Sequence, residues 1–314
     1  MAPMDFLFLI AGIAGLWIGT ELTIGGALAI ARRHRWSEFF VGLVILSIGS
    51  DLPELAIAVD AGIKGLMGQD ASGVVVGSSI GSVVAQMGFV LGLGAAISYL
   101  TLPKAFVVKH GSVLLGATVL LFLVALDGHV SRTEGLILIT IYFIYVTALM
   151  NGGTAPEEDP IRLAHGGFRS WTLLVAGLAV VIYSSGLTVD SVVRIAHTFE
   201  ISEALISVLF IGLGTSLPEL SISISAILKK KTHMSVGNII GSNILDTLLP
   251  IGITALIAEM TFERQLLYFD LPFIFVMTAV VLAFFYVKKG VTRPEGLVIL
   301  GFYATYVAVK LVQF

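Results

Sequence analysis

The sequence predicts an all-α integral membrane protein whose ten transmembrane helices form two inverted repeats of five. Three observations predict this fold. Hydrophobic residues make up 57% of the 314 residues and charged residues only 12%, with a mean hydropathy of +0.99. Apolar segments long enough to cross a bilayer recur along the chain, and the second half repeats the first. A soluble domain carries about 25% charged residues, so we expect neither a soluble protein nor an enzyme.

The predicted spans follow one another with short connections. A bilayer core of about 30 Å needs about 20 apolar residues in a helix. The first segment is too long for a cleaved signal peptide and contains Glu21, so it counts as a span. The segments that meet the length requirement are 4–31, 37–64, 71–99, 105–126, 132–151, 171–197, 202–228, 233–258, 265–287 and 292–312.

Charge predicts the orientation and the partners. Most of the 18 Lys and Arg residues lie near the loops after odd-numbered spans, and such loops face the cytoplasm. Both termini are therefore expected outside the cell, and a prokaryotic plasma membrane is the simplest location for so compact a chain. A net charge of −3 without a basic block predicts no nucleic-acid partner. The expected partners are the lipid bilayer and inorganic cations, with the chain working as a monomer.

The two halves of the chain match each other. Leu-Pro-Glu-Leu at 52–55 recurs 165 positions later at 217–220, and Gly-Ser at 81–82 recurs 160 positions later at 241–242. Five spans in each half is an odd number, so the second half enters the membrane from the opposite side. Secondary transporters are built in this way, with sites near mid-membrane on interrupted helices. The expected division is a first repeat half at 1–151, a central cytoplasmic loop at 152–170, and a second repeat half at 171–314.

Two spans carry a proline followed by a glutamate. Pro53 and Pro218 interrupt their helices because proline lacks an N–H and clashes with the preceding turn. The carbonyls freed by this break need partners that lipid does not offer, and a cation is one such partner. Glu54 and Glu219 lie one helical turn after the hydroxyl residues Ser50 and Thr215, and therefore share a face with them.

The next span of each half adds further polar side chains. Ser82 and Gln86 lie one turn apart in the third span, as do Ser242 and Asp246 in the eighth. Ionisable groups inside a membrane are costly and usually functional. The chain has no cysteine, and no histidine occurs in these motifs, so the donor set is all oxygen. Such a set suits a hard cation, and Ca²⁺ takes 6–8 oxygens.

These motifs resemble a known family. Residues 214–220 and 237–246 look like the second repeat of the calcium/cation antiporter superfamily, and most resemble its sodium/calcium exchanger branch. The resemblance covers the whole chain and implies no cofactor, with Ca²⁺ transported against H⁺ or Na⁺. It implies that Glu54 and Glu219 are the paired Ca²⁺ carboxylates. The further implied ligands are Asp246, Gln86, Ser50, Thr215, Ser82 and Ser242, with backbone carbonyls at Ser47 and Gly212. Asp51, Ser216 and Asn243, which stand in the same motifs, are further candidate ligands.

The first half departs from the family pattern at Asp51, where Ser or Thr is usual. Asp51 adds an ionisable group three residues from Glu54, and two carboxylates that close repel each other. Asp51, Glu54 and Glu219 are therefore the proton-coupling candidates, and Ca²⁺/H⁺ exchange is the favoured function. Na⁺/Ca²⁺ exchange at the same site is the alternative. Asp51 has a second interpretation, as the N-cap of the half-helix that begins near Pro53.

Two further function classes are compatible with parts of the sequence. A passive cation channel would also need polar groups at mid-membrane. An intramembrane hydrolase would use Asp51 and Asp246 as an acid pair, but it leaves the symmetric glutamates unexplained. No phosphate-binding Gly-x-x-x-x-Gly-Lys-Ser/Thr loop is present, so transport is expected to be driven by ion gradients.

Overall fold

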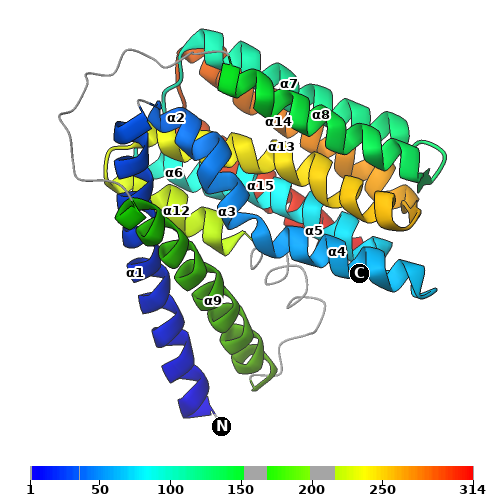
Figure 1. Ribbon diagram of the computed structural model, residues 1–314, viewed down its shortest axis with the longest axis horizontal. Coiled ribbons are helices and arrows are strands. Elements are labelled where there is room, and N and C mark those ends of the chain that lie inside the picture. Colours follow the sequence, from blue (N-terminus) through cyan, green and yellow to red (C-terminus); the bar gives the residue numbers. More distant parts are fainter. Residues whose placement is uncertain (1, 35, 152–167, 199–215, 314) are drawn as a thin grey trace.

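The computed structural model describes residues 2–34, 36–151, 168–198 and 216–313, which are almost entirely helical (Figure 1). Two short strands, β1 (His129–Val130) and β2 (Met260–Thr261), pair antiparallel. Three of the helical elements, η1, η2 and η4, have π geometry. The helical elements are α1 (Ala2–His34), α2 (Glu38–Phe40), η1 (Val41–Leu46), α3 (Ser47–Ser50), α4 (Leu52–Leu66), α5 (Ser72–Val84), η2 (Ala85–Val90), α6 (Leu91–Ile97), α7 (Lys104–Val124), α8 (Arg132–Asn151), α9 (Phe168–Thr198), α12 (Leu217–Leu228), α13 (Thr232–Ile257), η4 (Leu266–Asp270), α14 (Leu271–Lys288) and α15 (Arg293–Gln313).

The membrane spans agree with the sequence prediction where the chain is described. Within the described ranges, 8 helices are long and apolar enough to cross a membrane, and up to 9 if the bent pair Glu38–Ser50 and Leu52–Leu66 is one span. That pair bends by 46° at Asp51, which is where the sequence predicts the interruption. The predicted span 202–228 is described only from Ser216 onward, where the shorter apolar helix α12 begins.

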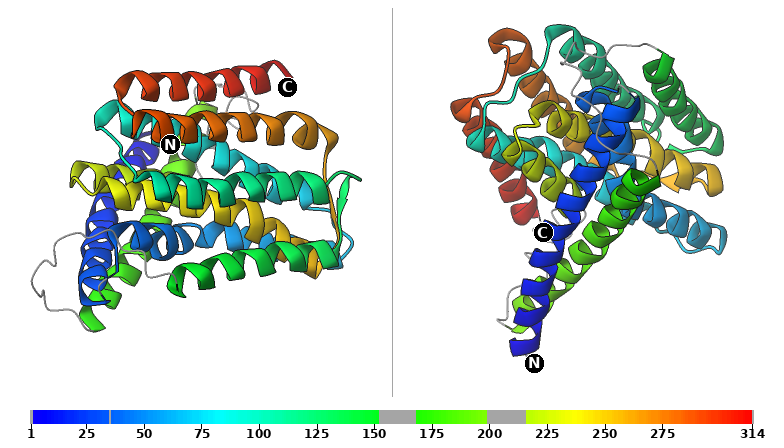
Figure 2. Two further views of the ribbon diagram at one scale, coloured as in Figure 1. Left: turned by 90° about the horizontal axis from the view of Figure 1, so that it is seen from above. Right: turned by 60° about the vertical axis from the view of Figure 1, so that its left-hand side comes forward.

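The helices α1 and α9 lie side by side and cross the rest of the bundle at a steep angle (Figures 1 and 2). Small residues let their backbones approach closely. A Cβ added to Gly12 would collide with the Thr188 side chain, and one added to Gly177 would lie 2.5 Å from the Thr23 nitrogen. Without a hydrophobic force between helices in lipid, such close packing is a main source of their association.

The most buried span is α13, which runs through the middle of the bundle (Figure 1). It packs against α4, α5, α8 and η1 of the first half and against α12 of the second, so it meets elements from both halves of the chain. It also carries many of the buried polar residues, from Ser235 to Thr254. A polar helix held at the centre of an apolar bundle positions its side chains away from lipid, which is where a transported ion needs them.

A pair of matched glycines tests this packing. A Cβ at Gly237 of α13 would lie 2.5 Å from the Phe39 carbonyl oxygen, whereas one at Gly77, the matching position of the first half, meets nothing within 4 Å. We expect Gly237→Ala to lower the free energy of unfolding by about 1–3 kcal/mol through overpacking. Gly77→Ala should be neutral or slightly stabilising, since alanine is the better helix former. Thermal unfolding in detergent checks this, and equal midpoints for the two variants would contradict the described packing.

Candidate cation-binding site

Three carboxylates meet near the starts of α4 and α12. Asp51, Glu54 and Glu219 each offer one oxygen, and these three oxygens lie within 4.8 Å of one another. All three residues are buried, at 0%, 2% and 0% exposure. Glu54 and Glu219 stand in the first turns of α4 and α12, which each begin with a proline in the first turn. Proline is tolerated in the first turn of a helix, and the N-terminal end of a helix stabilises negative charge. The first turns of α4 and α12 therefore favour ionised Glu54 and Glu219.

The carboxylates have no protein partner among the described residues. Both oxygens of Asp51, Glu54 and Glu219 are buried without a hydrogen bond. None of the ion pairs formed within the described ranges involves them. Unpaired buried carboxylates are strongly unfavourable. The arrangement therefore suits positive charge from outside the chain, as a metal ion or as protons.

Asp51 does not act as a helix cap here. It occupies the N-cap position of α4, but its side chain makes no capping hydrogen bond. Its counterpart at the start of α12, Ser216, also makes none, and its hydroxyl lies 3.1 Å from the Ser82 hydroxyl. Since an Asp N-cap is defined by that bond to a backbone N–H, the capping interpretation is not supported, and the carboxylate of Asp51 lies with the glutamates.

Gln86 is the centre of a buried hydrogen-bond network. Its amide nitrogen donates to the Ser82 hydroxyl and to Asp246 Oδ2, both at 3.0 Å. Its amide oxygen accepts from Asn243 Nδ2 at 2.9 Å. Gln86 therefore links η2 to α13 and holds Asp246 in place. Three buried polar atoms here have no hydrogen-bond partner within the described ranges, namely Asp246 Oδ1, Asn243 Oδ1 and the Ser242 hydroxyl.

This network yields a test of Gln86 as a positioning residue. Gln86→Leu removes both donors and the acceptor, so it leaves Asp246 Oδ2 and Asn243 Nδ2 without these bonds. We expect it to weaken Ca²⁺ binding about tenfold, equal to about 1.4 kcal/mol. Ca²⁺ titration of the purified protein measures this, and Gln86→Asn should restore part of the affinity. Unchanged affinity in Gln86→Leu would show that Asp246 needs no positioning.

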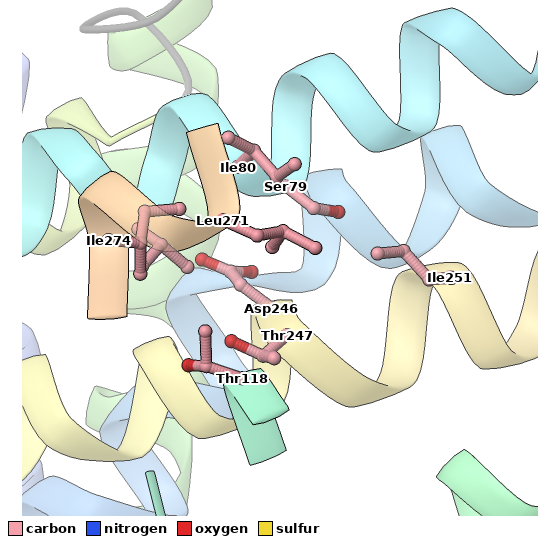
Figure 3. Close-up of a pocket in the computed structure, with 9 residues that line it drawn as sticks. Ser79, Ile80, Thr118, Asp246, Thr247, Ile251, Leu271 and Ile274 are labelled. Atoms are coloured by element: carbon pink, nitrogen blue, oxygen red, sulfur yellow. The ribbon is translucent and has the colours of Figure 1, made fainter. Parts of the chain in front are cut away.

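A small cavity lies on another side of Asp246 (Figure 3). Its volume of about 10 Å³ is near the minimum for one water molecule. Two threonines line it, and their hydroxyls donate to backbone carbonyls, Thr118 to Leu114 and Thr247 to Asn243. The sequence does not mark these threonines as site residues, because a lone Thr in an apolar span usually bonds its own helix in this way.

The remaining predicted ligands are placed as follows. Ser50 donates to the Ser47 carbonyl at 3.3 Å, and that carbonyl also accepts from the Asp51 N–H at 3.0 Å. The Ser47 carbonyl, a predicted backbone ligand, therefore accepts two hydrogen bonds in this structure. Thr215 and Gly212 lie outside the described residues.

Several relatives of this chain are exchangers or antiporters by name. Residues 4–151 and 169–312 match the family described as sodium/calcium exchanger protein. The sodium/calcium exchanger MaX1 of Methanosarcina acetivorans is 27% identical, over 98% of this chain and 99% of its own. The putative antiporter CaxA of Alkalimonas amylolytica is 28% identical over 96% of each chain.

The fold is shared with solved exchanger structures. The sodium-calcium exchanger NCX_Mj, soaked with 10 mM Na⁺ and 10 mM Sr²⁺, is 28% identical and has a TM-score of 0.84. The match covers 98% of this chain and 99% of that chain. NCX_Mj soaked with zero Na⁺ and Ca²⁺ matches with a TM-score of 0.83. The family match spans both halves of the chain, so the protein belongs to the sodium/calcium exchanger family of membrane antiporters.

Proposed function

We propose that the chain exchanges Ca²⁺ for H⁺ by alternating access, with Glu54 and Glu219 as the shared ligands. Family membership supports antiport of Ca²⁺ against another cation. The observation that carries the proposal is the buried cluster of Asp51, Glu54 and Glu219. One oxygen from each lies within 4.8 Å of the others, and none has a hydrogen-bond partner among the residues that the structure describes. A divalent ion needs several such oxygens, and it neutralises two of the three charges.

The third carboxylate is the reason for choosing H⁺. When Ca²⁺ leaves, three carboxylates remain together in a dry site, and nearby Asp246 adds a fourth. Like charges that close do not all ionise without compensation. Protons that bind these oxygens let the emptied site cross to the other side, whereas an uncompensated cluster would be held back by its charge. Asp51 adds a carboxylate to the two glutamates, so the emptied site needs more positive charge than a site with two glutamates alone.

Na⁺/Ca²⁺ exchange is the second candidate, and the named relatives favour it. MaX1 and NCX_Mj are both described as sodium/calcium exchangers. Uptake of ⁴⁵Ca²⁺ into proteoliposomes separates the two candidates when it is driven once by a pH gradient alone and once by an outward Na⁺ gradient. The proposal expects uptake with the pH gradient in Na⁺-free buffer. Uptake with the Na⁺ gradient only would replace it with the second candidate, and unitary currents would indicate a channel.

We further propose that the halves are inverted repeats, which matched contacts support. A two-fold axis requires that if residue i touches j, then the partner of j touches the partner of i. The repeat offset of 160–165 is added to the first-half residue of a contact and subtracted from the second-half residue. For several observed contacts, the resulting pair is also an observed contact. These pairs are Gly12–Thr188 with Gly177–Thr23, Gly92–Gly296 with Gly252–Gly135, and the backbone pairs Leu100–Val291 with Met260–Val130.

The remaining features of the proposal follow from the sequence and the family. Residues 1–151 and 171–314 form the two repeat halves, joined by the loop 152–170. The chain works as a monomer in a prokaryotic plasma membrane, with both termini outside. Inorganic cations are its substrates, and it needs no cofactor and catalyses no chemical reaction.

A further inference from the structure

One face of α13 carries buried polar side chains from its first turn to the central site. Ser235, Asn238, Ser242 and Asp246 are spaced so that they lie on the same side of the helix. At 1.5 Å per residue this row extends about 16 Å. All four residues have 0% exposure. The row therefore joins the Lys229–Lys231 end of the helix to the carboxylate cluster through the protein interior.

Several atoms of this row lack partners. The hydroxyls of Ser235 and Ser242 and the Asn238 amide oxygen are buried without a hydrogen bond among the described residues. The Asn238 amide nitrogen donates to the Ser223 hydroxyl at 3.3 Å, so its side chain points toward α12. Ser223 lies one turn after Glu219 on that helix. Buried polar atoms without hydrogen bonds destabilise a conformation. A conformation in which water or an ion reaches these atoms is therefore stabilised by the new contacts.

The first half of the chain carries this row only in part. The positions that match Ser223 and Ser235 are Ala58 and Val75, which are apolar and buried. Ser78, which matches Asn238, is polar, as are Ser82 and Gln86, which match Ser242 and Asp246 at the central site. Because the repeat folds with apolar residues at these positions, the polar ones are not required by helix packing. Ser223 and Ser235 therefore make the α12–α13 loop side of the molecule chemically different from the opposite side, where Ala58 and Val75 stand at the matching positions.

Two ion pairs cross the end of the row at the α12–α13 loop. Lys229 pairs with Glu21 of α1 at 2.6 Å, and Lys231 pairs with Glu38 of α2 at 2.5 Å. The Lys231 carbonyl also accepts a hydrogen bond from the Ser235 N–H, so the row begins one helical turn from this charged end. In the described state these contacts hold α1 and α2 against the loop, and the row has no exposed surface.

We propose that Ser223, Ser235 and Asn238 line the passage by which hydrated cations move between the central site and the water at the α12–α13 loop. The passage is closed in this structure, and it opens when α1 and α2 separate from the loop. The route to the opposite side does not use Ala58 and Val75. This inference rests on the proposed exchange at the central site.

Cysteine labelling tests the passage, because the chain contains no cysteine. Ser235→Cys introduces a single thiol of nearly the same size, and Val75→Cys is its matched control. A membrane-impermeant cationic methanethiosulfonate is applied to each side of vesicles separately. We expect Ser235→Cys to react from the α12–α13 loop side at least about tenfold faster than Val75→Cys, a ratio equal to about 1.4 kcal/mol. Modification should block ⁴⁵Ca²⁺ exchange in Ser235→Cys only.

The outcomes separate this inference from the proposed function. Equal labelling of the two thiols, or labelling of Ser235→Cys from the opposite side only, overturns the passage. If the wild-type protein, which has no cysteine, shows no Ca²⁺ exchange, the proposed function is wrong, whatever the labelling result. Asn238→Leu gives a second readout. As a passage residue it slows exchange without lowering the thermal midpoint, whereas a purely structural hydrogen bond predicts a lower midpoint with exchange retained. Ser78→Ala is the matched control and should keep exchange near the wild-type rate.

Discussion

Glu54→Gln and Glu219→Gln should each lower Ca²⁺ exchange at least about 100-fold, equal to about 2.8 kcal/mol of lost binding. The amide keeps the shape of the side chain but removes one of the charges that hold a divalent ion. Both glutamates are buried without hydrogen-bond partners in the part of the chain that the structure describes, so no described neighbour takes over their role. Uptake of ⁴⁵Ca²⁺ into proteoliposomes measures the loss. Retained exchange in either variant would remove the basis of the proposed site.

Stability separates loss of binding from loss of folding. Without Ca²⁺, the two variants should melt at or above the wild-type temperature, because each replaces an unpaired buried carboxylate with a neutral group. With saturating Ca²⁺, the wild-type midpoint should rise through ligand binding to the native state, and the variants should lose that rise. Asp60→Asn is the matched control, since Asp60 lies on the same helix α4 but is exposed and pairs with Lys64 at 2.6 Å. It should retain exchange.

Asp51→Ser should change the counter-ion from H⁺ to Na⁺. The second half of this chain already carries a serine at the matching position, Ser216, so the substitution makes the two halves alike. It removes the third carboxylate of the cluster and supplies a neutral hydroxyl of the kind that suits Na⁺. We expect Ca²⁺ uptake driven by a pH gradient to fall at least about tenfold, equal to about 1.4 kcal/mol. Uptake driven by an outward Na⁺ gradient should rise.

A second substitution at this position separates charge from size. Asp51→Asn keeps the shape of the side chain but carries no titrating proton. It should lose pH-driven uptake as Asp51→Ser does, because both remove the carboxyl group. Unchanged pH-driven uptake in both variants would show that Asp51 carries no proton, and the Ca²⁺/H⁺ assignment would then be wrong.

The sequence predicts the parts of the site that depend on local chemistry. Proline followed by glutamate predicts a broken helix with a carboxylate in its first turn, and the structure has the break at Asp51. The match between the halves identifies Glu54 and Glu219 as related residues before any contact is known. Spacing along a helix also places Ser82 and Gln86 on one face. Each of these inferences needs only one helix or the repeat offset.

The parts that the sequence does not predict depend on contacts between distant segments. Gln86 was expected to be a ligand, but whether its amide is free depends on Asn243 and Asp246, which come from the other half. Asp51 fits equally well as a cap or as a ligand, and only the direction of its side chain separates the two. The polar row on α13 follows helical spacing, but that its atoms lack partners depends on what the facing helix offers.

Anomalous diffraction from crystals soaked in Sr²⁺, a heavier analogue of Ca²⁺, tests the central claim most directly. The account predicts one strong peak between the first turns of α4 and α12. Its distance from oxygens of both Glu54 and Glu219 should be within the range of about 2.3–2.6 Å known for Ca²⁺, or slightly beyond it. The peak should weaken or vanish in Glu219→Gln crystals soaked in the same way. A divalent ion bound elsewhere, with these two carboxylates still unoccupied, would contradict the account.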